Sequence, residues 1–147
     1  MAVRKKVDLS VVVPVYNETE NVGLLAKEIH EALNGTPYEM IFVNDCSTDD
    51  TEAALVALKE TYPTLRALTH RKNAGQSRAV RTGILAANGS VIATLDGDGQ
   101  NDPADIPALY AQLTRKDAPE GLALVGGRRA KRKDTWAKRF ASRFGNG

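Results

Sequence analysis

Two carboxylates that stand one residue apart are the residues of this 147-residue sequence best suited to chemistry. Asp96 and Asp98 flank a glycine directly after the apolar run Ser90–Leu95, and Gln100 adds an amide oxygen two residues later. Hard divalent cations such as Mg²⁺ and Mn²⁺ prefer oxygen ligands and often keep coordination positions open for substrate phosphates. Asp96, Asp98 and Gln100 are therefore a candidate Mg²⁺ or Mn²⁺ site. An acidic loop that caps the next helix is the alternative.

Polar residues also follow two earlier apolar runs. Tyr16–Glu18 comes after Leu9–Val15, and Asn44 and Asp45 come after Val43. Asp45 could accept hydrogen bonds from a base or a sugar. The segment His70–Arg78 joins a further strand to a helix, where its cations and the helix N-terminus could meet an anion. Solvated surface charge is the alternative for that segment.

Several kinds of active site are disfavoured because the residue patterns they require are missing from the sequence. It contains no Ser/His/Asp or Cys/His arrangement, no Cys/His metal spacing, and no Gly-x-Gly-x-x-Gly or Walker-type loop. Hydrolase, zinc-site, dehydrogenase and nucleotide-triphosphatase interpretations are disfavoured for that reason. A single cysteine rules out an internal disulfide and is typical of a reducing compartment.

The elements that must position these groups alternate along the chain. We expect helices over Val22–Leu33, Thr51–Leu58, Ser77–Ala87 and from Asp102 to about Thr114, and strands over Leu9–Val15, Tyr38–Val43, Leu65–Thr69, Ser90–Leu95 and Leu122–Val125. Such alternation predicts an α/β fold with a mostly parallel, Rossmann-like sheet and helices on both faces. Ligands bind beyond the C-terminal strand ends of these sheets, so the three polar clusters should meet at one edge.

The net charge of +2 conceals a sharp asymmetry. Residues 1–127 hold 12 basic and 17 acidic residues, whereas residues 128–147 hold 8 basic and 1 acidic residue. Trp136, Phe140 and Phe144 recur every four residues among these cations, a pattern typical of a helix at a membrane interface. A core-facing stripe and a solvated charge run are alternatives. Nucleic-acid binding is a further one, and the acidic body argues against it.

Three motifs occur in order at suitable distances: 14–18, 43–49 and 95–103. Together they resemble those of the inverting glycosyltransferase family 2, which has the GT-A fold. The branch they resemble most is that of the polyprenyl- or dolichyl-phosphate sugar synthases. The resemblance covers residues 8–147. It implies metal-dependent transfer of a sugar from a nucleotide-diphosphate donor to a polyprenyl phosphate of the dolichyl or undecaprenyl type.

The resemblance also implies a role for individual residues. By this resemblance, the residues that would hold the donor nucleobase and ribose are Pro14, Tyr16, Glu18 and Asp45. The residues that would bind the metal and the donor diphosphate are Asp96, Asp98 and Gln100. Related enzymes direct an arginine toward the phosphate groups, and Arg128 matches that arginine; with Asp96 and Asp98 it makes up the implied catalytic set. The acceptor-phosphate stretch corresponds to Arg128, Lys138, Arg139 and Ser142. Two departures stand out: Asn44 replaces an aspartate of many relatives, and Gln76 replaces a lysine of some.

The expected organisation is a donor-binding domain over residues 1–127 and the start of a basic acceptor and membrane-proximal region over residues 128–147. Relatives of this branch continue further, so we expect a truncated chain with incomplete activity, peripheral at the cytoplasmic membrane face. A phosphate acceptor is largely a dianion near pH 7, because its second pKa is about 6, and needs no general base. Transfer to a soluble saccharide and a non-catalytic nucleotide-sugar binding module are the competing functions.

Overall fold

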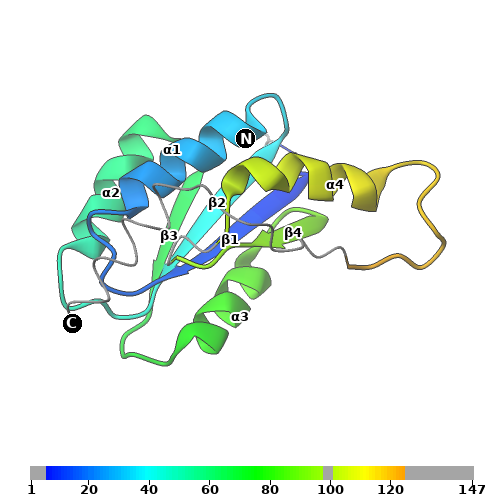
Figure 1. Cartoon of the computed structure of the whole chain (residues 1–147). Helices are drawn as coiled ribbons and strands as arrows, with labels where there is room; N and C mark the ends of the chain where they lie inside the picture. Colours follow the sequence, from blue (N-terminus) through cyan, green and yellow to red (C-terminus); the bar gives the residue numbers. More distant parts are fainter. Residues whose placement is uncertain (1–5, 98–100, 125–147) are drawn as a thin grey trace, which may run out of the picture.

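The computed structural model describes residues 6–97 and 101–124, which form a parallel sheet with helices on both faces (Figure 1). The four strands of this part of the chain are β1 (Leu9–Val15), β2 (Tyr38–Asn44), β3 (Leu65–Thr69) and β4 (Val91–Thr94). Their order across the sheet is β3-β2-β1-β4, and each neighbouring pair is parallel. Every residue of β1 and β2 is buried, because helices cover both faces of these central strands.

The helices lie where the apolar periodicity predicts them. They are α1 (Val22–Leu33), α2 (Thr51–Thr61), α3 (Gln76–Ala86), the short 3₁₀ helix η1 (Pro103–Asp105) and α4 (Ile106–Thr114). Helices α1, α2 and α4 cover one face of the sheet and α3 covers the other (Figure 1). The predicted α/β architecture is thereby confirmed. Within the described ranges, no helix has the length and apolar character needed to cross a bilayer.

The fifth strand predicted over Leu122–Val125 is wrong for the part that the structure describes. Leu122–Leu124 pair with no strand there, and Leu124 is 84% exposed. The chain instead makes a turn, in which the Leu122 N–H donates to the Pro119 carbonyl and Gly121 adopts a φ of +81°. A strand needs a neighbour for its backbone groups, and an apolar run does not specify one. Residues 128–147, the predicted second region, lie outside the described residues.

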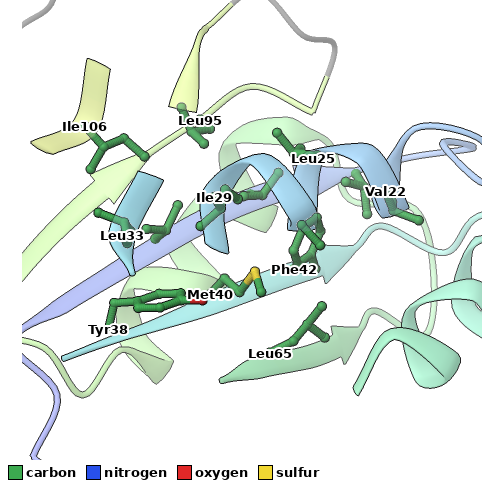
Figure 2. Packing of buried hydrophobic residues seen from close by; sticks show 14 of the residues in the cluster. Val22, Leu25, Ile29, Leu33, Tyr38, Met40, Phe42, Leu65, Leu95 and Ile106 are labelled. Carbon is green, nitrogen blue, oxygen red and sulfur yellow. The ribbon is translucent and has the colours of Figure 1, made fainter. Parts of the chain in front are cut away.

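The larger part of the core lies between α1 and the sheet. Val22, Leu25, Ile29 and Leu33 form one buried stripe of α1, which packs against β2 (Figure 2). The opposite face depends on a close approach of α3 to β1. A Cβ on Gly83 would lie 2.3 Å from a Val12 methyl carbon, so only glycine allows α3 to pack at this distance. This approach brings the start of α3 beside the C-terminal ends of the strands.

A buried carboxylate holds the opposite end of the sheet together. Glu39, which is 4% exposed, accepts hydrogen bonds from the Ser10 hydroxyl (2.7 Å), Arg66 Nη1 (3.0 Å) and the Asn88 backbone N–H (2.7 Å). Ser10 in turn accepts from the Gly89 N–H at 2.8 Å. These bonds connect β1, β2 and β3 to the segment between α3 and β4, and therefore fix where α3 ends.

The pKa of the Glu39 carboxyl indicates how the stability of the protein should depend on pH. Burial raises the pKa of its carboxyl, but hydrogen bonds from Asn88, Ser10 and Arg66 outweigh burial and hold the pKa below its ordinary value. A carboxyl with a lower pKa in the folded state stabilises the protein above its unfolded pKa of about 4.3, and this contribution is lost as the pH falls further. We therefore expect the melting temperature to hold between pH 7 and pH 5 and to fall below about pH 4.3.

The Glu39→Gln variant isolates this carboxyl. We expect it to be less stable at pH 7 by about 1–3 kcal/mol, because an amide cannot accept at every position that the carboxylate serves. We also expect its melting temperature to fall less steeply in acid than that of the wild type. Asp45 and Asp49, whose pKa values also lie below their ordinary range, should supply the remaining slope. Equal slopes for both proteins in thermal unfolding followed by circular dichroism would contradict the assignment.

Candidate functional site

A pocket of about 290 Å³ opens at the C-terminal ends of β1, β2 and β4, where the sequence predicts that the polar clusters meet. Its lining includes all five predicted site residues that the structure describes, and consists of Pro14, Val15, Tyr16, Glu18, Asp45, Gln76, Ala79, Asp96 and Gly97. Three strand ends and the first turn of α3 therefore form one cavity. Neither Gln76 nor Ala79 was predicted as a site residue.

The loop from β1 to α1 is fixed by Asn17. This residue has a φ of +53°, a left-handed conformation that asparagine adopts more readily than most residues. Its side-chain oxygen accepts the backbone N–H groups of Thr48 (2.8 Å) and Asp49 (3.3 Å) on the loop after β2. The two loops are thus bonded to each other. Tyr16 on one side of Asn17 is 46% exposed, so its ring is available at the edge of the pocket.

Glu18 lies on the other side of Asn17 and is buried. Its Oε2 accepts from Asn21 Nδ2 at 2.7 Å, and its backbone N–H donates to the Thr51 hydroxyl at 2.9 Å. The first bond connects the carboxylate to the start of α1, and the second connects the Glu18 backbone to the start of α2. Glu18 therefore lines the pocket with a side chain that the Asn21 hydrogen bond holds in place.

Asp45, the first residue after β2, binds the segment that leads into α3. Its Oδ1 accepts from His70 Nδ1 and from the Ala74 N–H, and its Oδ2 accepts from the Gly75 N–H, each at 2.8 Å. The Asp45 backbone carbonyl accepts from Asn73 Nδ2 at 3.2 Å. We refer to this set of bonds as the Asp45 clamp. It places a buried carboxylate at the N-terminus of α3, where the helix dipole favours negative charge.

The clamp decides the charge state of Asp45. Burial raises the pKa of this carboxyl, but hydrogen bonds from His70, Ala74 and Gly75 outweigh burial and hold the pKa below its ordinary value. A carboxylate offers about four acceptor positions. Within the described part of the chain, three of them are occupied, which leaves one on Oδ2. Asp45 could therefore accept one N–H or O–H from a base or ribose while it holds α3 in place.

Asp96 enters the pocket two residues after β4. Its backbone N–H donates to Asn101 Oδ1 at 2.9 Å, and its carboxylate Oδ1 accepts from Gln76 Nε2 at 2.9 Å. The next residue packs closely against β1, because a Cβ on Gly97 would lie 2.3 Å from the Pro14 carbonyl oxygen. The turn that carries Asp96 is thus set against the end of β1.

Of the three predicted metal ligands, only Asp96 lies within the residues that the structure describes. Asp96 supplies a partly exposed carboxylate on the pocket wall, which suits a hard divalent cation. No group of three or more His, Cys, Asp or Glu residues suited to a metal occurs within residues 6–97 and 101–124. The remaining predicted site residues lie outside those ranges; they are Asp98, Gln100, Arg128, Lys138, Arg139 and Ser142.

The sequence was compared with models of protein families and with curated proteins, and both comparisons found matches over most of the chain. The model of glycosyl transferase family 2 matches residues 10–145. A dodecaprenyl-phosphate galacturonate synthase from Rhizobium johnstonii is 40% identical over 134 residues, which cover 88% of this chain and 38% of that protein. An undecaprenyl-phosphate 4-deoxy-4-formamido-L-arabinose transferase from Enterobacter sp. is 39% identical over 141 residues, which cover 94% and 42%. The chain thus spans about two fifths of the length of these curated relatives.

Solved structures share the arrangement of sheet and helices. The mannosyltransferase PcManGT from Pyrobaculum calidifontis, in complex with GDP-Man and Mn²⁺, has a TM-score of 0.60 and 26% identity. The match covers 68% of this chain and 30% of that one. Staphylococcus aureus TarS 1–349, in complex with UDP-GlcNAc, has a TM-score of 0.61 and 23% identity. That match covers 72% and 31%, and it bears on the fold alone.

Proposed function

Because this chain belongs to glycosyl transferase family 2 and has the GT-A fold, we propose that it forms the donor-binding part of an inverting glycosyltransferase. The proposed reaction transfers a sugar from a nucleotide-diphosphate donor to a polyprenyl phosphate. The observation that carries this proposal is the single pocket lined by Pro14, Tyr16, Glu18, Asp45 and Asp96. Both curated relatives described above are named as transferases or synthases that act with a polyprenyl phosphate, which supports the acceptor class.

The pocket wall suggests how the donor is bound. The exposed ring of Tyr16 can stack against a nucleobase, since aromatic faces and bases stack readily. The remaining acceptor position of Asp45 Oδ2 can take an N–H of the base or an O–H of the ribose. Asp96 lies on another strand end of the same pocket, where a diphosphate would follow. Base and diphosphate would thereby be held by different strand ends.

A divalent cation belongs to the proposed site. Asp96 would hold it together with Asp98 and Gln100, and the ion would supply positive charge to the leaving nucleotide diphosphate. The Mn²⁺ and GDP-Man in the PcManGT complex support this assignment. The chain's own part is to place Asp96 at the diphosphate end of the pocket.

The acceptor side of the proposal rests on the basic C-terminal stretch. A phosphate monoester is largely dianionic near pH 7 and attacks without a general base, so it needs positive charge above all. Arg128, Lys138 and Arg139 would supply that charge, with Ser142 as a hydrogen-bond donor. Because a polyprenyl phosphate resides in a membrane, we propose peripheral attachment through residues 128–147, and not a nucleic-acid partner.

Calorimetric titration with UDP- and GDP-sugars, with and without Mn²⁺, tests the proposal. We expect one class of donor to bind, and Mn²⁺ to strengthen its binding. The Asp96→Asn variant should lose the Mn²⁺-dependent gain by roughly tenfold or more, because one carboxylate charge at the ion is removed. Asp105→Asn is the matched control, since Asp105 is exposed and does not line the pocket. Failure of the chain to bind any nucleotide sugar, in either condition, would refute the proposal.

A further inference from the structure

Gln76 reaches from the start of α3 to the carboxylate at the diphosphate end of the pocket. Its Nε2 donates to Asp96 Oδ1 at 2.9 Å, and both residues line the pocket wall. The other hydrogen bond given for Asp96 uses its backbone N–H, which donates to Asn101. Within the described residues, Gln76 is therefore the side chain that hydrogen-bonds the Asp96 carboxylate.

The position of Gln76 is set by the Asp45 clamp. Ala74 and Gly75, the two residues before it, donate their backbone N–H groups to the Asp45 carboxylate. Gly75 has a φ of +95°, which turns the chain into the helix at this point. In the first turn of α3, the N–H of the buried Ala79 donates to the Gly75 carbonyl at 3.1 Å. The backbone from which the Gln76 side chain extends is therefore held from both sides.

One line of hydrogen bonds consequently crosses the pocket. It runs from Asp45 at the end of β2, through Gly75 and Gln76 at the start of α3, to Asp96 after β4. Strand β1 lies between β2 and β4 in the sheet, so this line bridges two strand ends that are not neighbours.

An amide is a suitable partner for a carboxylate that must also bind a cation. It occupies one acceptor position on Oδ1 and leaves Oδ2 available, and as a neutral donor it does not cancel the carboxylate charge. A lysine at this position would place an ammonium group against the same oxygen. Partners of this kind orient the ligands of a metal, and their loss typically weakens metal binding by about 10-fold to 100-fold.

We propose that Gln76 is a positioning residue for Asp96: it orients this carboxylate toward the divalent cation and the donor diphosphate without neutralising it. The inference rests on the proposed function, since it takes Asp96 as a ligand of the cation. It gives a residue of α3 a role at the cation, whereas the predicted site residues that the structure describes lie on strand ends and the loops that follow them.

Mn²⁺ binding, measured directly by electron paramagnetic resonance of the free ion, tests this role in Gln76→Leu and Gln76→Lys. The titration is performed with UDP or GDP, whichever the chain binds more tightly. We expect Gln76→Leu to weaken Mn²⁺ binding about tenfold and Gln76→Lys to weaken it further, because the lysine also supplies a competing charge. Ser77→Ala is the matched control, since Ser77 is exposed and does not line the pocket, and it should change Mn²⁺ affinity less than twofold.

A second measurement separates positioning from a merely structural role. Nucleotide affinity without metal should fall far less than Mn²⁺ affinity in Gln76→Leu, and the melting temperature should match that of the wild type, because the Asp45 clamp is untouched. Unchanged Mn²⁺ affinity in both Gln76 variants, with normal binding by the wild type, would overturn this inference alone. An equal loss of metal-free nucleotide affinity and Mn²⁺ affinity would also overturn it. Absence of Mn²⁺ binding by the wild type would overturn the metal-dependent function and this inference with it.

Discussion

Replacing Asp45 with alanine should lower the free energy of unfolding by about 3 kcal/mol and abolish nucleotide binding. The carboxylate is 4% exposed and accepts from His70, Ala74 and Gly75, so its removal leaves three donors without their acceptor. Hydrogen bonds to a charged acceptor contribute more than the mean hydrogen bond, about 1.5–3 kcal/mol each, and water replaces only part of them because these bonds are partly buried. The start of α3 would be released at the same time, and Gln76 with it.

Urea unfolding and nucleotide titration of the same variants measure both effects. Asp50→Ala is the matched control, because Asp50 is an exposed aspartate of the same loop and makes no side-chain cap bond to α2. It should change stability by less than about 0.5 kcal/mol. Asp45→Asn should fall between the two, since it keeps one acceptor oxygen but turns an NH₂ group toward a backbone N–H. A loss of less than about 1 kcal/mol in Asp45→Ala would show that the clamp is not what holds α3.

Gly97→Ala should have the second-largest effect. A Cβ at this position would lie 2.3 Å from the Pro14 carbonyl oxygen and 3.1 Å from a Val15 methyl carbon. The Pro14 oxygen belongs to β1, which pairs with β2 along its whole length, so the turn that carries Gly97 must move instead. We expect a loss of about 2 kcal/mol in stability from this overpacking. Because Asp96 would move with the turn, Mn²⁺-dependent donor binding should fall roughly tenfold or more.

Gly23→Ala provides the control for this substitution. Gly23 lies in α1, and a Cβ there would have no atom within 4 Å. The same chemical change should therefore leave stability unaltered or raise it by up to about 1 kcal/mol, which is what alanine gains over glycine in a helix interior. Chemical unfolding and Mn²⁺-dependent titration of both variants would decide the matter. Equal stability of Gly97→Ala and Gly23→Ala would mean that the turn can move away from β1 at no cost.

Some local features of the site follow from short segments of sequence. The acidic turn before Thr51 predicts that Asp49 and Asp50 cap α2; Asp49 Oδ1 does accept the Thr51 N–H at 3.0 Å, whereas Asp50 makes no side-chain cap bond. Asp102 followed by proline predicts a helix start, and the Asp102 side chain accepts the Ala104 N–H at 2.9 Å before η1 and α4. Such caps depend on residues two or three positions apart, so the sequence is enough to locate them.

Three residues of the site acquire their roles from distant partners. Gln76 stands out in the sequence only as a departure from a lysine of some relatives, and its contact with Asp96 joins residues 20 positions apart. Asn17 bonds to a loop 31 positions away. The position of His70 at the end of a strand is visible in the sequence, but its bond to Asp45 spans 25 positions. No periodicity or local motif specifies which of these side chains meet.

The sequence by itself determines the parallel sheet, its helices, and the strand ends at which polar residues gather. It can do so because continuous apolar runs and 3.6-residue periodicity are local properties, and because parallel strands all end at the same edge. Only the tertiary structure decides that Leu122–Leu124 pair with no described strand, that Asp45 holds the start of α3, and that Gln76 meets Asp96. These features depend on which backbone groups find neighbours and on how loops place side chains from distant segments, and a linear pattern does not encode either.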